Sequence, residues 1–235
     1  MTTDPADYKK QAATYTVDTF VQSGMILGLG VGSTAIHAIR RLAQRIESGE
    51  LTDIQAIPCA SQVEEEARRL GITLTTLEAY PSIDLTFDGA DEVDPAWNLI
   101  KGGGGALLRE KIVAQATRQE IIMVDESKLV PRLGTNWAVP IEVVSFGWGS
   151  QIEFLKSLGG SPHLRKNSDD TIFYTDHRNV IIDCNFGPID DPERLAQTLK
   201  SRTGIVEHGL FLGLAHAVVV AGEAGVRILT KAIGR

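Results

Sequence analysis

The sequence has few cysteines and no long apolar run. Of its 235 residues only Cys59 and Cys184 are cysteines, and no C-x-x-C motif occurs. This usage suits the reducing cytosol, so we expect a cytoplasmic protein whose two thiols only fill space in the core or at the surface. No stretch approaches the about 20 apolar residues that span a bilayer. The polar, acidic start MTTDPADYKK is also unlike a secretion signal or a transit peptide.

An excess of positive charge is also missing. The chain has 23 Lys and Arg against 30 Asp and Glu, a formal net charge of −7, and both signs are mixed along it. We therefore expect no nucleic-acid partner and no membrane partner, because such binders carry a basic stripe. A small anionic substrate stays possible, since a few cations and backbone amides suffice to hold it. Aromatics make up 6% and hydrophobic residues 43%, typical of a soluble globular protein.

Short apolar strands alternate with amphipathic helices over the first half of the chain. The pattern predicts helices near 7–21, 33–46, 61–71 and 106–117, and strands near 25–30, 54–60, 83–91 and 120–128. This alternation indicates an α/β domain with a mostly parallel sheet covered on both faces. The tail HAVVVAGEAGVRIL reads as one more strand with an edge that returns to this sheet.

A different order follows Pro131. Strand, helix and strand signals are followed by a hairpin that turns at 176–179, then by a helix near 191–201 and a closing strand, GIVEHGLF. This β-α-β-β-α-β order predicts a small ferredoxin-like α+β domain. We therefore expect a first domain of residues 1–130 and 206–235 and a second domain of residues 131–205.

Ligands of open α/β sheets bind at loops beyond the carboxyl ends of the strands. One such loop is GLGVGST, Gly28 to Thr34, whose glycines and following helix suit an anion. A dinucleotide-binding loop is not indicated, because it needs glycine where Ser33 stands and an acid after the next strand, and the sequence has neither. A P-loop is excluded as well, because no Gly-Lys-Ser/Thr follows. We expect a phosphate or sugar-phosphate cradle here. The alternative is a tight turn that binds nothing.

Two acids close the third strand in FDGADEVD. Asp88 and Asp91, with Glu92 and Asp94 behind them, could hold a hard cation, although the calcium-loop pattern is not met. They could equally be turn and cap residues, which is common for Asp beside Gly.

Four consecutive glycines, Gly102 to Gly105, stand between Lys101 and a predicted helix. Such a run lets backbone N–H groups surround an oxyanion, and the lysine adds a full charge. Glu110 shares a helix stripe with small apolar residues, so we expect it to be partly desolvated and a stronger base. Arg109 and Lys111 are expected to be solvated. The alternative for Glu110 is a partnered surface glutamate.

A base, an anion cradle, a cation and paired carboxylates together suit proton abstraction beside the carbonyl of a phosphorylated sugar. No metal and no redox cofactor is required by this chemistry, and the five histidines show no ligand spacing.

The motifs GLGVGSTA, FDGADEVD, LIKGGGGALLREKI and VDESK, in this order and spacing, resemble ribose-5-phosphate isomerase of the A type. The resemblance runs from about Tyr8 to the tail. It implies a Rossmann-like main domain with a small α/β lobe, and interconversion of D-ribose 5-phosphate and D-ribulose 5-phosphate through an enediolate without a cofactor, in the non-oxidative pentose phosphate pathway. It also implies a homodimer or homotetramer.

The resemblance implies a role for each motif. Glu110 is the base that moves a proton between C1 and C2, Asp88 and Asp91 assist ring opening and hydroxyl proton transfer, and Lys101 stabilises the oxyanion. Substrate contacts are implied for Lys9, Val31, Gly32, Ser33, Thr34, Gly89, Ala90, Gly102, Gly103, Gly104 and Lys128. One departure is Val31, where many relatives have threonine, so one hydroxyl contact is missing.

Two competing functions fit the sequence less well. A non-catalytic sugar-phosphate sensor normally carries an N-terminal helix-turn-helix, and about 20 residues before the glycine loop are too few for one. A sensor also has no need for Glu110 beside Lys101 and two aspartates. An NAD-dependent enzyme is excluded because Ser33 stands where the dinucleotide-binding motif needs its third glycine.

Overall fold

The computed structural model describes residues 5–229. The chain forms two compact units. The first unit comprises the chain up to Ala90, Arg109–Lys128, and the chain from Leu214 on. The second comprises Asp91–Leu108 and Leu129–Gly213. The chain therefore passes back and forth between the units, while the domain limits expected from the sequence stay a prediction.

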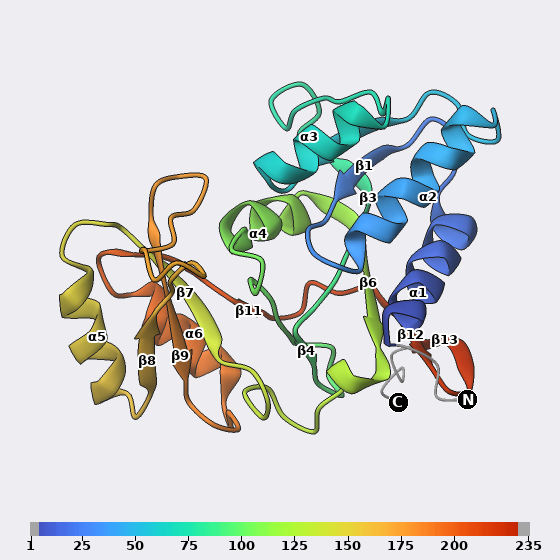
Figure 1. Ribbon diagram of the computed structural model, residues 1–235. Helices are drawn as coiled ribbons and strands as arrows, with labels where there is room; N and C mark the ends of the chain where they lie inside the picture. Colours follow the sequence, from blue (N-terminus) through green and yellow to red (C-terminus); the bar gives the residue numbers. More distant parts are fainter. Residues whose placement is uncertain (1–4, 230–235) are drawn as a thin grey trace. The chain divides into compact units, whose positions relative to one another are not determined.

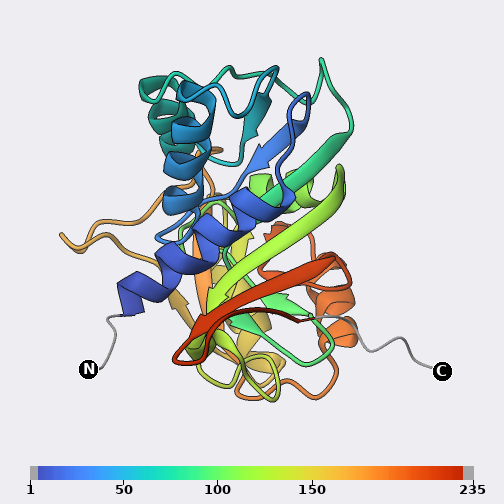
Figure 2. The same cartoon turned by 90° about the vertical axis from the view of Figure 1, so that its right-hand side faces the viewer.

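The first unit is built on a six-stranded sheet, seen in Figure 2. Its strands are β1 (Ile26–Leu29), β2 (Gln55–Pro58), β3 (Ile83–Asp88), β6 (Thr117–Asp125), β12 (Ala217–Gly222) and β13 (Gly225–Leu229). The order is β13-β12-β6-β3-β1-β2, and every pair is parallel except β12 with β13. The predicted parallel sheet and the return of the tail to it are confirmed. Parallel strands place the loops after β1, β3 and β6 at one edge.

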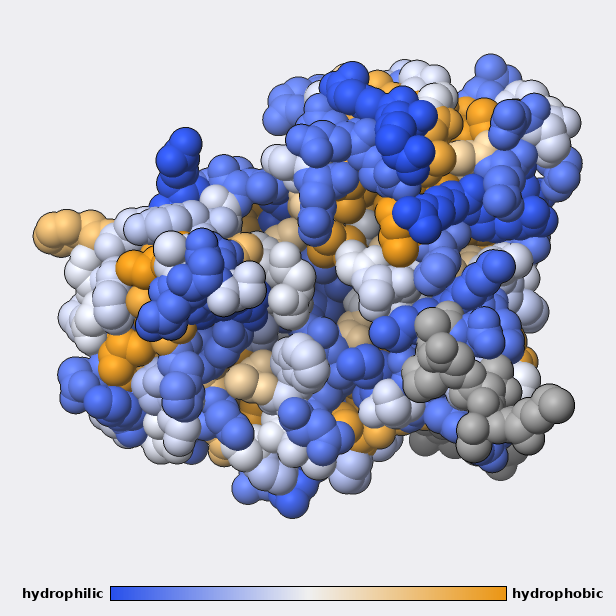
Figure 3. All heavy atoms as spheres, viewed as in Figure 1, coloured by the Kyte–Doolittle hydropathy of each residue, from blue (hydrophilic) through white to orange (hydrophobic). Residues whose placement is uncertain are grey.

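Helices cover both faces of this sheet (Figure 1). They are α1 (Pro5–Phe20), α2 (Ala35–Glu47), α3 (Ser61–Arg69) and α4 (Leu107–Gln115), with a short 3₁₀ turn, Glu126–Lys128, after β6. Helix α2 buries Ala35, Ala38, Ile39, Leu42 and Ala43, one apolar stripe at helical spacing. On the face drawn in Figure 3, hydrophilic side chains cover the outer sides of α2 and α3, and hydrophobic ones lie between them.

The second unit contains a four-stranded antiparallel sheet of order β10-β7-β9-β8. The strands are β7 (Val139–Val143), β8 (Ser161–Leu164), β9 (Val180–Asn185) and β10 (Ile205–His208), and the helices are α5 (Trp148–Ser157) and α6 (Pro192–Lys200). Asp191 caps α6 by accepting the N–H of Arg194. This order and pairing are those of the split β-α-β unit, which confirms the predicted α/β fold with a ferredoxin-like part.

Two details differ from the predicted strands. The first arm of the expected hairpin, residues 171–176, makes only isolated bridges to its neighbours. The expected strand GIVEHGLF is broken at Gly209, whose N–H bonds to Pro140 O at 2.7 Å. A Cβ on Gly209 would lie 2.3 Å from Lys101 O, so the chain turns there and β11 (Leu210–Phe211) joins a separate sheet. This sheet has the order β11-β5-β4, with β4 (Glu92–Val93) and β5 (Leu99–Ile100).

None of the helices in the described part of the chain is long and apolar enough to cross a membrane.

The tight approach of β1 to its neighbours generates a first prediction. A Cβ on Gly28 would lie 2.0 Å from Thr86 Oγ1 and 2.7 Å from Val113 Cγ1 of α4. Thr86 is held by a hydrogen bond of 2.6 Å to Thr117 Oγ1, so it cannot move aside freely. We expect Gly28→Ala to lower the free energy of unfolding by about 1–3 kcal/mol, measured by urea denaturation.

Gly149→Ala is the matched control. Nothing lies within 4 Å of a Cβ at that position, which is inside α5, so alanine should be neutral or stabilising there. Equal stability of the Gly28→Ala variant and the parent would contradict the packing argument.

Candidate active site

In the first unit, the loop after β1 is shaped around a buried carboxylate. Asp88 ends β3 and is 1% exposed, and its Oδ1 accepts the N–H of Val31 at 3.1 Å and that of Gly89 at 2.7 Å. A Cβ on Gly30 would lie 2.2 Å from the same oxygen. Only glycine at this position lets the carboxylate reach the loop amides. The loop after β1 and the DGAD motif are thus brought together, as parallel strand ends allow.

The same loop carries a hydroxyl beside a cation. Lys9 of α1 donates from its Nζ to Ser33 Oγ at 3.1 Å. Gly32 has φ = +111°, a value that glycine adopts readily, and Thr34 immediately precedes α2. The N–H groups of a first helical turn and its dipole favour an anion. The structure therefore places Lys9, Ser33 and Thr34 at one potential anion site.

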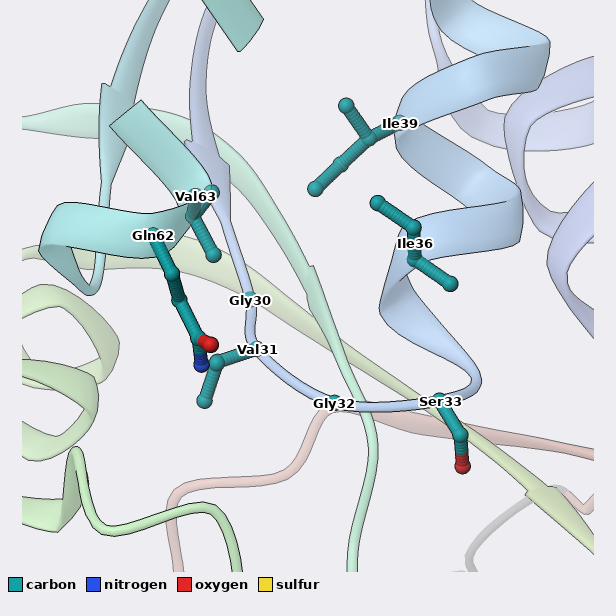
Figure 4. A pocket seen from close by; sticks show the side chains of 8 residues that line it. All are labelled: Gly30, Val31, Gly32, Ser33, Ile36, Ile39, Gln62 and Val63. Carbon is teal, nitrogen blue, oxygen red and sulfur yellow. The ribbon is translucent and has the colours of Figure 1, made fainter. Parts of the chain in front are cut away.

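Val31 contributes its backbone rather than its side chain to this loop. The side chain is 7% exposed and lines a cavity of about 240 Å³ together with Gly30, Gly32, Ser33, Ile36, Ile39, Gln62 and Val63. In Figure 4, Ile36 and Ile39 of α2 and Val63 of α3 point into this apolar space, and the Ser33 hydroxyl points away from it. Valine suits such a wall, while the Val31 N–H remains available to Asp88.

Glu110 lies on α4 and is 3% exposed. Its stripe neighbours Val113 and Ala114 are each 3% exposed, so the predicted desolvation of Glu110 agrees with the structure. The prediction for Lys111 was wrong, because that side chain is only 6% exposed. Helix α4 is covered around most of its circumference and leaves mainly Ile112 and Gln115 to solvent, so adjacent residues are buried together.

Lys128 ends the 3₁₀ turn after β6 and is half-buried. The turn is stabilised by Asp125, whose Oδ1 accepts the Ser127 N–H at 3.0 Å. Since β6 is parallel to β3 and next to it, Lys128 belongs to the same edge of the sheet as Asp88.

Ala90 ends the first segment of the first unit, and the second unit holds Asp91, Lys101 and the glycine run. Lys101 follows β5 and is 2% exposed, with its Nζ 5.5 Å from the centroid of the Phe211 ring and its N–H bonded to Gly209 O at 2.9 Å. Asp91 accepts the Gly103 N–H at 2.8 Å on Oδ2 and donates its own N–H to Ile100 O at 2.8 Å. Asp91 thus contacts the glycine run directly, and Lys101 precedes it in the chain.

The glycine run makes a tight turn. Gly102 has φ = +101° and Gly105 has φ = +83°, and the Gly105 N–H bonds to Gly102 O at 3.0 Å. Gly103 and Gly104 are exposed between them. Exposed peptide groups without side chains are what an oxyanion or phosphate requires of a backbone site.

His37 was not singled out by the sequence. It stands one turn into α2 from Ser33, and its pKa is below the ordinary value, first because of burial and then because of the positive charges of Arg40, Lys10 and Lys9. These charges make the start of α2 electropositive. Among residues 5–229, no group of three or more His, Cys, Asp and Glu side chains is arranged to hold a metal ion.

The fold and these features define a class: an α/β protein with a glycine-rich loop before a helix, buried carboxylates and a buried lysine, joined to a ferredoxin-like unit. Known proteins agree. The family model described as ribose 5-phosphate isomerase A (phosphoriboisomerase A) matches residues 55–225. A protein of Chloroflexus aurantiacus named ribose-5-phosphate isomerase A is 51% identical over 230 residues, which are 98% of this chain and 96% of the relative.

Solved structures give the same result. A ribose 5-phosphate isomerase from Plasmodium falciparum has a TM-score of 0.93 and 42% identity, covering 97% of this chain and 99% of that one. A D-ribose-5-phosphate isomerase in complex with phospho-erythronic acid has a TM-score of 0.94 and 38% identity, covering 97% of this chain and all of that one. The chain belongs to the ribose 5-phosphate isomerase A family, and it is an isomerase.

The electropositive start of α2 generates a prediction. A phosphate dianion bound there would favour protonated His37 and oppose the effect of Lys9, Lys10 and Arg40. We expect inorganic phosphate to raise the pKa of His37, followed by NMR titration of its ring protons. The resonances of the exposed His177 serve as an internal control. In a Lys9→Ala variant the response should shrink, and an identical His37 titration with and without phosphate would argue against an anion at this loop.

Proposed function

We propose that the protein is an aldose-ketose isomerase that interconverts D-ribose 5-phosphate and D-ribulose 5-phosphate through an enediolate, in the non-oxidative pentose phosphate pathway. The observation that carries this proposal is the family match over nearly the whole chain, in a sequence that keeps a buried glutamate, two aspartates and a buried lysine in the family's motifs. Neither a metal nor a redox cofactor is needed for a proton transfer of this kind.

Glu110 is the base in this proposal. A carboxylate that is 3% exposed is poorly solvated, and desolvation favours the protonated form, so the carboxylate takes up a proton readily. It removes the proton from C2 of the open-chain aldose and returns it to C1. The electron pair left at C2 forms the enediolate, and the carbonyl moves from C1 to C2.

Lys101 and the glycine amides stabilise the negative charge that develops on oxygen during this transfer. Preorganised charges and N–H groups do so at low cost, because they need not reorient as the charge appears. The buried position of Lys101, 2% exposed, strengthens its field by excluding water.

Asp88 and Asp91 handle the hydroxyl protons. They assist ring opening and then move a proton between the two substrate oxygens. Asp88 is held by the N–H groups of Val31 and Gly89, and Asp91 by that of Gly103, so backbone hydrogen bonds set the position of each carboxylate.

The phosphate end is assigned to the start of α2. Lys9, Ser33 and Thr34 with the amide of Gly32, and Lys128 from the loop after β6, supply positive charge and hydrogen-bond donors. The remaining sugar contacts are assigned to Gly89, Ala90, Gly102, Gly103 and Gly104. The similar structure solved with phospho-erythronic acid supports a phosphorylated sugar as the substrate, since a phosphorylated acid can mimic a phosphorylated enediolate, and such analogues bind tightly. We expect phospho-erythronate to bind this chain as well.

A cytoplasmic location and a homodimeric or homotetrameric assembly belong to the same proposal. Light scattering coupled to size-exclusion chromatography should give two or four times the chain mass of 25.4 kDa. A single chain mass at working concentration would refute the assembly and leave the activity untouched.

The base assignment predicts the outcome of one substitution. Glu110→Gln keeps the shape of the side chain and removes its ability to accept a proton. We expect turnover of ribose 5-phosphate to fall by about 10²–10⁴-fold with KM little changed. The assay follows ketopentose phosphate formation in the presence of EDTA.

Glu65→Gln is the matched control, because Glu65 is an exposed glutamate on α3. It should match the parent in rate. Near-normal turnover by Glu110→Gln would refute the base. No conversion by the parent, with ribose 5-phosphate still raising the melting temperature, would identify a sensor instead.

A further inference from the structure

The glycine run needs an external support. Four glycines in succession have more conformational freedom than any other tetrapeptide. The proposed chemistry nevertheless requires their peptide groups to stay within about 0.5 Å of the productive geometry. The internal bond from the Gly105 N–H to Gly102 O closes the turn, but it does not orient the exposed peptides at Gly103 and Gly104.

Arg165 provides this support from within the same unit. Its Nη1 donates to Gly102 O at 2.9 Å and to Gly103 O at 3.2 Å. Oxygen and hydrogen point in opposite directions across a trans peptide. Holding the Gly102 oxygen therefore aims the Gly103 N–H away from Arg165, and that N–H is the one bonded to Asp91. Holding the Gly103 oxygen likewise aims the Gly104 N–H away from Arg165.

The guanidinium is itself firmly held. Its Nε donates to Asp183 Oδ2 at 2.8 Å, and its Nη2 donates to Asp183 Oδ1. The side chain is 14% exposed. The backbone of Arg165 is fixed between β9 and the hairpin, by its N–H to Ile181 O at 2.8 Å and by its carbonyl, which accepts the N–H of Phe173 at 3.1 Å. A bidentate pair of this kind fixes direction as well as charge.

Phe173 closes the support from a second side. Its ring centroid lies 5.8 Å from the Arg165 guanidinium, and a Cβ on Gly105 would lie 2.4 Å from its Cζ. The ring thus leaves room for glycine alone at the end of the run.

We propose that Arg165 is a positioning residue for the isomerase reaction. It holds the carbonyl oxygens of Gly102 and Gly103, and through them it sets the direction of the N–H groups that position Asp91 and face the substrate. This inference rests on the proposed function of the glycine run. Lysine cannot replace Arg165, because a single ammonium group cannot form two parallel hydrogen bonds to Asp183 and still reach both carbonyl oxygens.

The test compares Arg165→Lys and Arg165→Met with Arg202→Lys. Arg202 is a matched control in the same unit, since it also stacks on a ring, 4.9 Å from Phe154, and hydrogen-bonds to Gln151. We expect both Arg165 variants to lower kcat by about 10–100-fold, the loss that a displacement of about 1 Å causes, with a smaller change in KM. Affinity for phospho-erythronate should fall with kcat, while affinity for inorganic phosphate should not. Arg202→Lys should change none of these.

A variant in the core of the same unit shows whether a loss of stability alone would lower kcat. Ile182→Val, at a site that is 0% exposed on β9, should lower the melting temperature without lowering kcat. The inference is overturned if Arg165→Lys keeps the parent's kcat, or if phosphate and phospho-erythronate affinities fall together.

Failure of the proposed function is distinguishable from failure of this inference, because in that case the parent protein itself does not convert ribose 5-phosphate. In that case the backbone amide resonances of Gly103 and Gly104 decide the inference, because they must shift in Arg165→Lys and stay unchanged in Arg202→Lys.

Discussion

The approach of β1 to β3 without intervening side chains is the constraint on which the first unit depends. Gly28 lies against Thr86 and Gly30 against the Asp88 carboxylate, so the two strands can place an acid directly among loop amides. Any larger residue at either position would push the strand ends apart. The position of Asp88, the path of the loop and the start of α2 all follow from this one close contact.

Buried charge is the second theme. Asp88, Lys101 and Glu110 are each no more than 3% exposed, although charged groups are seldom buried so completely. Removing them from water costs stability, and natural proteins accept such costs mainly where charge must act on a ligand. The hydrogen bonds to Asp88 show how backbone N–H groups offset part of this cost.

Much of the fold could be predicted, because it rests on local patterns. The apolar strands, the helix stripes and the glycine-bounded loops follow from neighbouring residues, and so does Glu110's burial, while Lys9 was implied only by the resemblance to a known family. Longer-range features could not be predicted. The support of Gly102 by Arg165 joins residues 63 positions apart. The three short strands β4, β5 and β11 are too short to show a detectable hydrophobic pattern. Lys111 is buried because α4 is covered around most of its circumference. Such contacts depend on tertiary packing, which periodicity does not encode.

The division of the chain has a consequence for its synthesis. The sheet of the first unit begins with β1, β2 and β3, but β6 follows the first excursion into the second unit, and β12 follows the long segment Leu129–Gly213. Because synthesis runs from the N-terminus, β3 emerges from the ribosome with one edge still unpaired. The sheet cannot be completed until β12 and β13 have been made. A nascent chain of this protein therefore exposes a β edge throughout the translation of Leu129–Gly213, when it is vulnerable to aggregation and in need of chaperones.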